Sequence, residues 1–282
     1  MGFSCAQIIV VLVAAAFTVY YSGQAPEIMK KVSELVTGKK GCLPVGDIDF
    51  VTIHYFNGRG RGEVIRMMLE EAQIPYNETN FTKDTWPEAK KKGVESGMYT
   101  FGQVPAITTS GGLSLVQSQT IAQYIGRATG MQCDCESLHY CDILARGAED
   151  FRSKLSKILY DSSFSVDMRN DYILNTAPMW LGYFEKIAPS LHQQESSPYF
   201  VDGRLTWVDF IIFDLLDSNV EFATYDMGEP LISVLDSYTK LNTFYQKFKA
   251  MPRVAAYLKS PRRRPYKIPN VPTPRAKLVQ PK

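Results

Sequence analysis

The segment that most constrains the fold is a short apolar run that leads directly into a glycine-rich turn. Residues 51–56 have the length and the β-branched and aromatic content of a strand. Residues 57–62 alternate glycine with asparagine and arginine, and residues 61–73 repeat apolar side chains at helical spacing. Tyr55 therefore stands at the end of a first strand, beside a turn and a helix start. A phenol there can direct a hydrogen bond at a ligand, or its hydroxyl can be satisfied inside the protein.

The elements after this strand change character near residue 130. A second strand is expected at 76–81, an irregular stretch follows, and residues 103–108 and 113–116 predict a hairpin around Gly111-Gly112, followed by a helix. Beyond residue 130 helical periodicity dominates, through residues 138–160, 170–188, 206–222 and 231–259. The pattern predicts an α/β domain followed by an all-α domain.

The order of elements in the first domain resembles the thioredoxin-like fold. Redox enzymes with that fold need a Cys-x-x-Cys motif after the first strand, where this chain has Tyr55 and no cysteine. Thiol–disulfide exchange by that route is therefore excluded. In the second domain Thr206 and Asp209 outline a capping box. Residues 201–209 also resemble the folding signature of a known helical domain, and that resemblance implies a structural role for Asp209. The expected divisions are a hydrophobic membrane anchor, a linker, a thioredoxin-like domain, an all-helical domain and a basic proline-rich tail, at residues 1–24, 25–49, 50–128, 135–260 and 261–282.

Charge is distributed unevenly along the chain. The 282 residues carry a net charge of +2, but the tail at 261–282 has seven basic residues and no acidic one, so the remainder carries −5. A mildly acidic body with a basic tail does not indicate a nucleic-acid enzyme. The tail is rich in proline and is expected to be disordered.

The five cysteines form no even, regularly spaced framework. We interpret them as reduced thiols of an intracellular protein. Cys133 and Cys135 form a Cys-x-Cys pair that lacks partners at metal-ligand spacing, so a connecting segment is favoured over a metal site. No metal is required by this reading.

The N-terminal residues contain the longest apolar run. Residues 8–21 carry no charge, and the run extends back to Phe3 with two polar interruptions, which is at the short end of what spans a bilayer. A cleaved signal peptide needs a basic start and a small-x-small site, and both are poor here. Because the nearest lysines all follow the run, a retained single-pass anchor with a cytoplasmic domain is expected.

The turn after the first strand also carries a family resemblance. Tyr-Phe-Asn-Gly-Arg-Gly-Arg at 55–61 resembles the opening of the glutathione transferases that use tyrosine, most closely the sigma class. The resemblance covers roughly residues 50–260. It implies that the hydroxyl of Tyr55 stabilises the thiolate of glutathione, with Arg61 supporting the site electrostatically.

Further residues match the glutathione-binding pattern of that family. Trp86 and Lys90 lie four apart, as in the pair that holds the glycine carboxylate, although Lys90 also belongs to a run of lysines that solvent alone can explain. Gln103, Val104 and Pro105 match the segment with a cis-proline whose preceding backbone pairs with the cysteinyl residue.

The resemblance also implies which residues bind the carboxylate and the ammonium of glutathione's γ-glutamyl group. Gln117 and Ser118, at a helix N-terminus, match the site of the γ-glutamyl carboxylate, and Ser118 can also be a helix N-cap. Asp150 matches the residue that reaches the γ-glutamyl ammonium of the other subunit, which implies a homodimer. Tyr160 falls where some classes place a second tyrosine over the electrophile.

The resemblance implies a glutathione transferase that acts on hydrophobic electrophiles. Two alternatives share the same fold. One is a glutathione-dependent prostaglandin isomerase that uses the same site, and the other is a non-catalytic structural or assembly subunit. Retention of Tyr55, Trp86, Gln117, Ser118 and Asp150 favours glutathione binding, because a scaffold would not need all five.

Overall fold

The computed structural model describes residues 48–188, 197–227 and 232–269. The expected anchor and nearly all of the expected linker lie outside these residues. Within them, strands occur between residues 51 and 116, and only helices follow residue 118.

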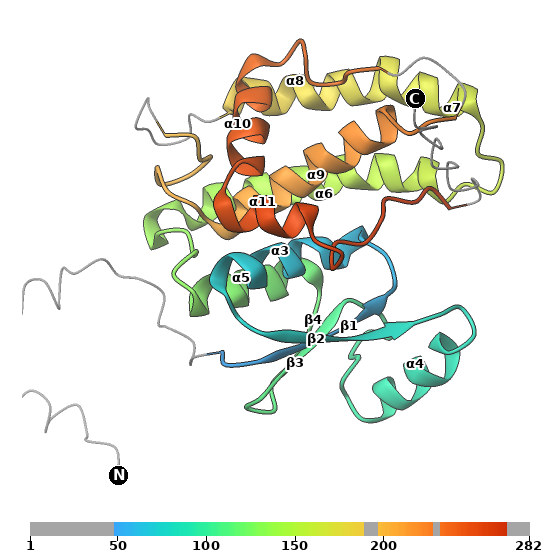
Figure 1. The fold of residues 1–282 in the computed structure, drawn as a ribbon, viewed down its shortest axis with the longest axis vertical. Helices are drawn as coiled ribbons and strands as arrows, with labels where there is room; N and C mark the ends of the chain where they lie inside the picture. The colour runs from blue at the N-terminus through green and yellow to red at the C-terminus, as the bar shows by residue number, and fades with distance from the viewer. Residues whose placement is uncertain (1–47, 189–196, 228–231, 270–282) are drawn as a thin grey trace, which may run out of the picture. The chain divides into compact units, whose positions relative to one another are not determined.

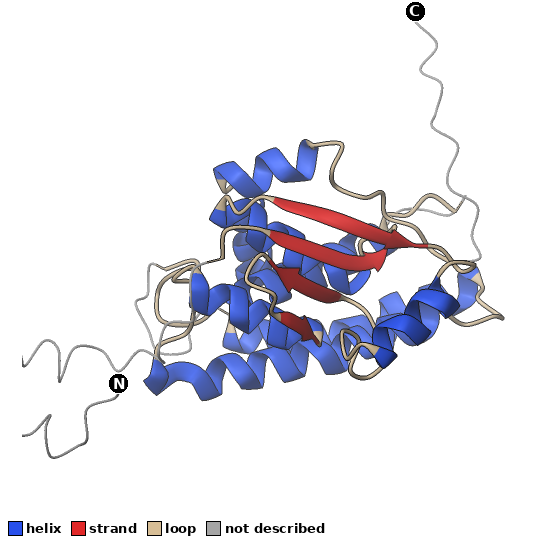
Figure 2. Ribbon diagram, turned by 90° about the horizontal axis from the view of Figure 1, so that it is seen from below, coloured by secondary structure: helices blue, strands red, loops and turns tan. Residues whose placement is uncertain are grey.

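The first domain is built on a four-stranded sheet (Figure 2). Its strands are β1 Val51–Phe56, β2 Tyr76–Phe81, β3 Ala106–Thr109 and β4 Ser114–Val116. They lie in the order β2-β1-β3-β4, with β1 parallel to β2 and the other pairs antiparallel. A parallel pair needs a crossover, which α3 Glu63–Ala72 supplies after a short turn of 3₁₀ helix at Gly60–Gly62. The predicted order of strands and helices is confirmed, except between β2 and β3.

Alternate side chains of β1 face two different layers. Val51 and Ile53 point into the main core with α3 and α5 Ser118–Ala128, and Phe56 points into a small aromatic cluster on the opposite face. Figure 1 shows α3 and α5 between the sheet and the helical domain, with α4 on the other side of the sheet.

Helix α4, Trp86–Glu95, corrects the expectation of an irregular stretch. The segment has few apolar positions, so helical periodicity does not reveal it. Its start is marked instead by Pro87 in the first turn and by a reciprocal pair of bonds in which the backbone N–H of Thr82 and of Thr85 each donates to the other's hydroxyl, at 2.9 and 3.1 Å. Local turn chemistry therefore sets this helix, with its first residue, Trp86, beside the sheet.

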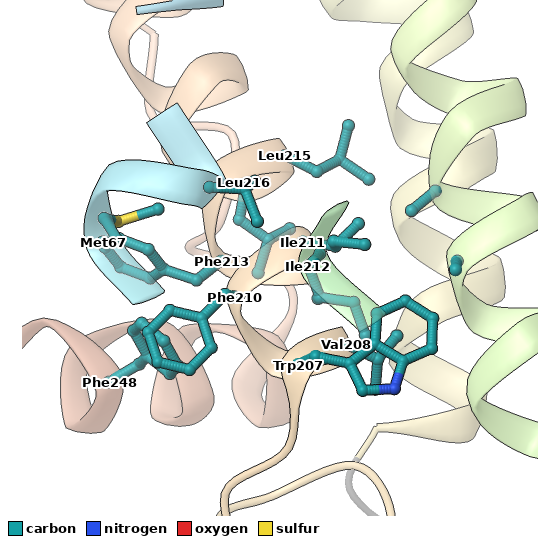
Figure 3. Packing of buried hydrophobic residues seen from close by; sticks show 14 of the residues in the cluster. Met67, Trp207, Val208, Phe210, Ile211, Ile212, Phe213, Leu215, Leu216 and Phe248 are labelled. Atoms are coloured by element: carbon teal, nitrogen blue, oxygen red, sulfur yellow. The ribbon is translucent and has the colours of Figure 1, made fainter. Parts of the chain in front are cut away.

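The second domain is helical throughout its described residues, as predicted. Its helices are α6 Leu138–Leu159, α7 Val166–Asp171, a π-helical turn Tyr172–Thr176, α8 Ala177–Ile187, α9 Trp207–Ala223, α10 Thr239–Lys249 and α11 Pro252–Lys259. Helix α9 is buried on almost all sides. Figure 3 shows Phe210, Phe213 and Phe248 packed beside Met67 of α3, with ring centroids of Phe213 and Phe248 4.5 Å apart.

The predicted capping box at the start of α9 is present. The backbone N–H of Thr206 donates to the Asp209 carboxylate at 2.8 Å, and the backbone N–H of Phe200 donates to the same carboxylate at 3.0 Å. Burial raises the pKa of Asp209 to about 7, although these hydrogen bonds oppose the shift. The side chain is wholly enclosed, in keeping with a folding role.

The segment between the domains contains a disulfide, so the expectation of reduced thiols is wrong there. Cys133 and Cys141 are bonded, with Cα atoms 6.6 Å apart. The first turn of α6 brings Cys141 back toward the connecting segment, and no sequence spacing reveals such a return. Cys135 lies half-buried between them, and Cys5 and Cys42 lie outside the described residues.

The beginning of the basic tail is packed against the body, which corrects the expectation of disorder for residues 261–269. Arg262 pairs with Glu70 at 2.8 Å, and Ile268 is 2% exposed. Composition alone predicts a solvated tail, because the acidic partners lie some 50 to 200 residues away in sequence.

Among the residues that the structure describes, no helix is long and apolar enough to cross a membrane. Helix α6 is the longest, at 22 residues, but it carries charged side chains along its length, and α9, though apolar, has 17 residues. On this finding the prediction of a single-pass, membrane-anchored protein with a cytoplasmic domain is wrong. The apolar run at 8–21 itself lies outside the described residues.

Candidate active site

A cavity of about 600 Å³ opens where the carboxyl end of β1 and the start of α5 face helix α6. That volume lies in the range of small-ligand sites. The residues lining it are Phe56, Arg61, Trp86, Phe101, Gly102, Gln103, Val104, Pro105, Val116, Gln117, Ser118, Gln119, Arg146 and Glu149. Seven of the predicted site residues are thereby brought together: Arg61, Trp86, Gln103, Val104, Pro105, Gln117 and Ser118.

Tyr55 is half-buried at the end of β1, beside this cavity but outside its lining. Its hydroxyl oxygen accepts a hydrogen bond from the backbone N–H of Arg61 at 3.0 Å. The ring packs against the turn so closely that a Cβ at Gly60 would lie 2.5 Å from the hydroxyl, and one at Gly62 would lie 2.8 Å from the ring. Only glycine fits at these two positions.

The environment keeps the Tyr55 hydroxyl protonated. Burial raises its pKa, and the N–H of Arg61 opposes that shift, with a net rise above the usual value. The phenol of Tyr160 adds to the rise in the Tyr55 pKa. Since the oxygen already accepts a bond, the hydroxyl proton remains available for donation to a ligand.

Arg61 links the turn to the helical domain. Its guanidinium makes two bonds of 2.5 Å to the carboxylate of Glu149 on α6. Burial disfavours the charge of Glu149, but Arg61 outweighs it and lowers the pKa of the carboxyl. Glu149 and Arg146, which line the cavity one turn apart, were missed in the sequence. Their spacing of three residues on one helix is the signal that finds them.

The Val104–Pro105 peptide bond is cis, as predicted. Val104 and Gln103 lie in the segment that leads into β3, at the cavity wall. Gln117, which directly follows the neighbouring strand β4, is the N-cap residue of α5, with φ +70, and Ser118 is the first residue of the helix. The alternative in which Ser118 is the N-cap is therefore wrong. The unpaired N–H groups of this first turn can bind a carboxylate.

Trp86 and Lys90 reach the cavity from α4. The indole lies 5.6 Å from Phe56 and 5.7 Å from Tyr99, measured between ring centroids. Lys90 is outside the lining but lies beside it, because its Cε would be 2.7 Å from a Cβ at Gly102, which lines the cavity.

The loop after α4 is fixed by Tyr99, which sequence reasoning did not single out. Its ring covers Gly93, and its hydroxyl lies 3.2 Å from Nδ1 of His54, whose Nε2 lies 3.1 Å from the hydroxyl of Thr108. Burial lowers the pKa of His54, so the imidazole is neutral at pH 7. This pair ties the loop that carries Phe101 and Gln103 to the sheet.

Asp150 and Tyr160 lie outside the cavity. Asp150 is exposed on α6, next to Glu149, and Tyr160 follows the end of that helix with 69% of its surface exposed. Their predicted roles toward the second subunit and the electrophile stay predictions. Among the described residues, no group of three or more His, Cys, Asp or Glu side chains is placed to hold a metal ion.

Comparison with known proteins identifies the family. The family models for the glutathione S-transferase N-terminal and C-terminal domains match residues 51–127 and 149–261. Glutathione S-transferase Mu 2 of Homo sapiens is 29% identical over 217 residues, which make up 75% of this chain and 92% of that protein. Glutathione S-transferase P 1 of Xenopus laevis is 27% identical over 210 residues, or 73% of this chain and 90% of that protein.

Solved structures show the same fold. A Pi-class glutathione S-transferase of Onchocerca volvulus superimposes with a TM-score of 0.63 at 23% identity, over 74% of this chain and 91% of that one. A thioredoxin-like domain joined to an all-helical domain, with a cavity where they meet, defines the class of protein. The chain belongs to the glutathione S-transferase superfamily.

This membership decides several predictions. The fold class, the assignment as an enzyme of this family and glutathione as its substrate are confirmed. The finer resemblance to the sigma class is not supported, because the relatives named above are of the mu and P types. Both family models begin after residue 50, so neither accounts for the predicted membrane segment.

Proposed function

We propose that this enzyme conjugates glutathione to hydrophobic electrophiles and that Tyr55 activates the thiol. The observation that carries the proposal is the bond from the Arg61 N–H to the Tyr55 oxygen at 3.0 Å. That bond orients the phenol and leaves its proton free to donate to a sulfur at the cavity edge. Accepting a bond also makes the hydroxyl a stronger donor.

The chemistry needs this donor because glutathione is mostly un-ionised at neutral pH. A thiol with a pKa of about 8.5 is only about 3% thiolate at pH 7, and each unit by which the pKa falls is worth about 1.4 kcal/mol. The thiol proton leaves to solvent, and Tyr55 stabilises the resulting sulfur anion. The sulfur then bonds to the electrophilic carbon, and the leaving group or an activated double bond takes up the electron pair.

Three parts of glutathione have a proposed partner in the cavity or beside it. The start of α5, with Gln117 and Ser118, suits the γ-glutamyl carboxylate. The backbone of Val104 suits the cysteinyl residue as an added strand would. Lys90 and the indole N–H of Trp86 suit the glycine carboxylate at the other end.

Arg61 supports the site without contacting the thiol in this proposal. Its bidentate pair with Glu149 holds the turn against α6, and its backbone supplies the donor to Tyr55. Tyr160, which follows the end of α6, is proposed to face the electrophile because the family resemblance puts a second tyrosine there.

We further propose a homodimer. Large apolar side chains are exposed on the cavity loop and on α6 and α8, namely Phe101 at 65%, Ile143 at 61%, Met179 at 49% and Tyr183 at 51%. Exposed apolar residues of this kind are typical of subunit interfaces. In this dimer we propose that Asp150 of the second copy reaches the γ-glutamyl ammonium, as the family resemblance implies. The oligomeric state is measured by sedimentation equilibrium.

The sigma-class resemblance remains a prediction that depends on the Tyr55 motif and the spacing of Trp86 and Lys90. It is tested by measuring which electrophilic substrates the enzyme uses. Activity on a panel of aromatic halides, enones and prostaglandin endoperoxides would separate general conjugation from isomerisation.

The test of the central proposal is Tyr55→Phe, with Tyr199→Phe in the helical domain as the matched control. We expect Tyr55→Phe to be retained on immobilised glutathione but to lose conjugation of an aromatic halide at pH 6.5, with partial recovery at pH 8.5, where solution supplies thiolate. Tyr199→Phe should behave as the unmodified enzyme. An unmodified rate for Tyr55→Phe at pH 6.5 would refute the assigned role.

A further inference from the structure

The turn that positions Tyr55 is intrinsically loose. Three of its six residues, Gly58, Gly60 and Gly62, are glycines, and glycine loses more conformational freedom on folding than any other residue. The turn must therefore be held by contacts from outside. One comes from Arg66 of α3, which is wholly buried and donates to the carbonyls of Gly58 at 3.0 Å and of Arg59 at 3.4 Å.

The second set of contacts comes from the far end of the chain. The side chain of Arg59 leaves the turn and donates through Nε to the carbonyl of Arg264 at 2.6 Å. It pairs with Glu221 of α9 at 2.9 Å and lies over the ring of Tyr266, 5.6 Å from its centroid. A guanidinium over an aromatic face is attracted to it. We call residues 263–266, which follow α11, the clasp.

The clasp is itself firmly bound to the body. Arg263 is 11% exposed and pairs with Asp217 of α9 and with Glu63 of α3, the latter at 3.3 Å. Arg264 reaches Glu78 of β2 at 3.5 Å. Burial raises the pKa of the Tyr266 hydroxyl, whose oxygen has no hydrogen-bond partner, so the ring contributes by packing.

Charge is balanced across this region. Four arginines face four carboxylates; the arginines are Arg59, Arg66, Arg263 and Arg264, and the carboxylates are Glu63, Glu78, Asp217 and Glu221. Such a network is rigid when complete, and removing one member leaves another charge uncompensated. The network connects α3, β2, α9 and the clasp to a single side chain of the turn, Arg59.

We propose that the clasp is a positioning element for catalysis: through Arg59 it fixes the turn so that the Arg61 N–H meets the Tyr55 oxygen. The proposal depends on the role proposed above for Tyr55. Residues about 200 positions away from the nucleophile-activating tyrosine then set how strongly its hydroxyl donates. When the clasp is disturbed, the turn gains freedom, the 3.0 Å bond is made less often, and the bound thiol becomes less acidic.

The neighbouring Arg262 provides a matched control. It belongs to the same basic run but pairs with Glu70 near the opposite end of α3, and it is 61% exposed. Its loss removes one arginine from the same segment without touching Arg59 or the turn.

The experiment compares Tyr266→Leu, Arg59→Met, Arg262→Ala and Tyr55→Phe in the full chain. The pKa of enzyme-bound glutathione is read from the ultraviolet absorbance of its thiolate during a pH titration, and glutathione affinity is measured by calorimetry. For Tyr266→Leu and Arg59→Met we expect the thiol pKa to rise by about one unit, a tenfold change in ionisation. The glutathione Kd should stay within about twofold of the unmodified value, and Arg262→Ala should change neither quantity.

The outcomes separate the clasp from the proposed function. If Tyr55→Phe raises the thiol pKa but folded Tyr266→Leu and Arg59→Met do not, the clasp inference is overturned and the role of Tyr55 stands. If Tyr55→Phe leaves the thiol pKa unchanged, both fall. A loss of glutathione affinity together with the pKa shift would indicate a collapsed site and would also overturn the positioning role. Should Tyr266→Leu fail to fold, Arg59→Met decides alone.

Discussion

Replacing Gly60 by alanine tests the geometry around Tyr55 with a single methyl group. The backbone at Gly60 has φ +41, and a Cβ there would lie 2.5 Å from the Tyr55 hydroxyl. The left-handed region costs an alanine about 1–2 kcal/mol relative to glycine. The methyl group must also push the hydroxyl about 0.9 Å away to reach the 3.4 Å of ordinary contact. A shift of that size breaks the bond to the Arg61 N–H.

Gly112 supplies the matched control. It has φ +81 in the turn between β3 and β4, and a Cβ there would meet nothing within 4 Å. Gly112→Ala therefore carries the same backbone cost without touching Tyr55. Both variants should lower the melting temperature, by about 2–4 °C for each kcal/mol lost in a domain pair of this size.

Only Gly60→Ala should affect catalysis beyond this loss of stability. Removing one well-placed donor from a developing anion typically costs a hundredfold or more in rate. Because the phenol is displaced and not deleted, we expect kcat/KM at pH 6.5 to fall about tenfold to hundredfold. The assay is steady-state conjugation of an aromatic halide at saturating glutathione. Equal kcat/KM for folded Gly60→Ala and Gly112→Ala would refute the reasoning.

Three further predictions concern other elements. Asp150→Ala should raise the KM for glutathione more than it lowers kcat, and mixing it with a Tyr55→Phe subunit should restore one intact site per heterodimer; strictly additive loss would place the site within one chain. Thr206→Ala should lower the free energy of unfolding in urea by about 1 kcal/mol, since it removes the cap of α9; an unchanged midpoint would contradict this. Because His54 has a lowered pKa in the folded protein, the unfolded state binds more protons than the folded state near pH 6.5, and the free energy of unfolding should fall as the pH drops through that value. Urea titrations at pH 5.5 and 7.5 measure this fall, which should be smaller in His54→Gln than in the unmodified protein.

Local pattern was sufficient for most elements of the fold. The strands at 51–56 and 76–81 and the capping box at Thr206 follow from short-range signals, namely strand propensity and a cap four residues long. The cis bond before Pro105 came from the family resemblance. Helix α4 was not predicted because its start is set by a local turn and not by an apolar face.

What the sequence could not show is pairing between distant residues. The clasp arginines read as a solvated tail because their carboxylates lie on α3, β2 and α9, and only the folded chain brings these elements together. The same holds for Arg61 with Glu149, which are 88 residues apart. Cys133 and Cys141 are only 8 residues apart, but their approach depends on where α6 begins. In each case the missing information is a contact between elements and not a property of either residue.

The layer formed by α3 and α5 belongs to both domains at once. One side of these helices covers the sheet, and the other side receives α9, with Met67 among the rings of the helical core. Heat or denaturant should therefore melt the two domains in one transition. The N-terminal half cut free after Ala128 would expose an apolar surface that the other half normally covers. Transplanting that half alone into another protein would require a new surface for α3 to pack against.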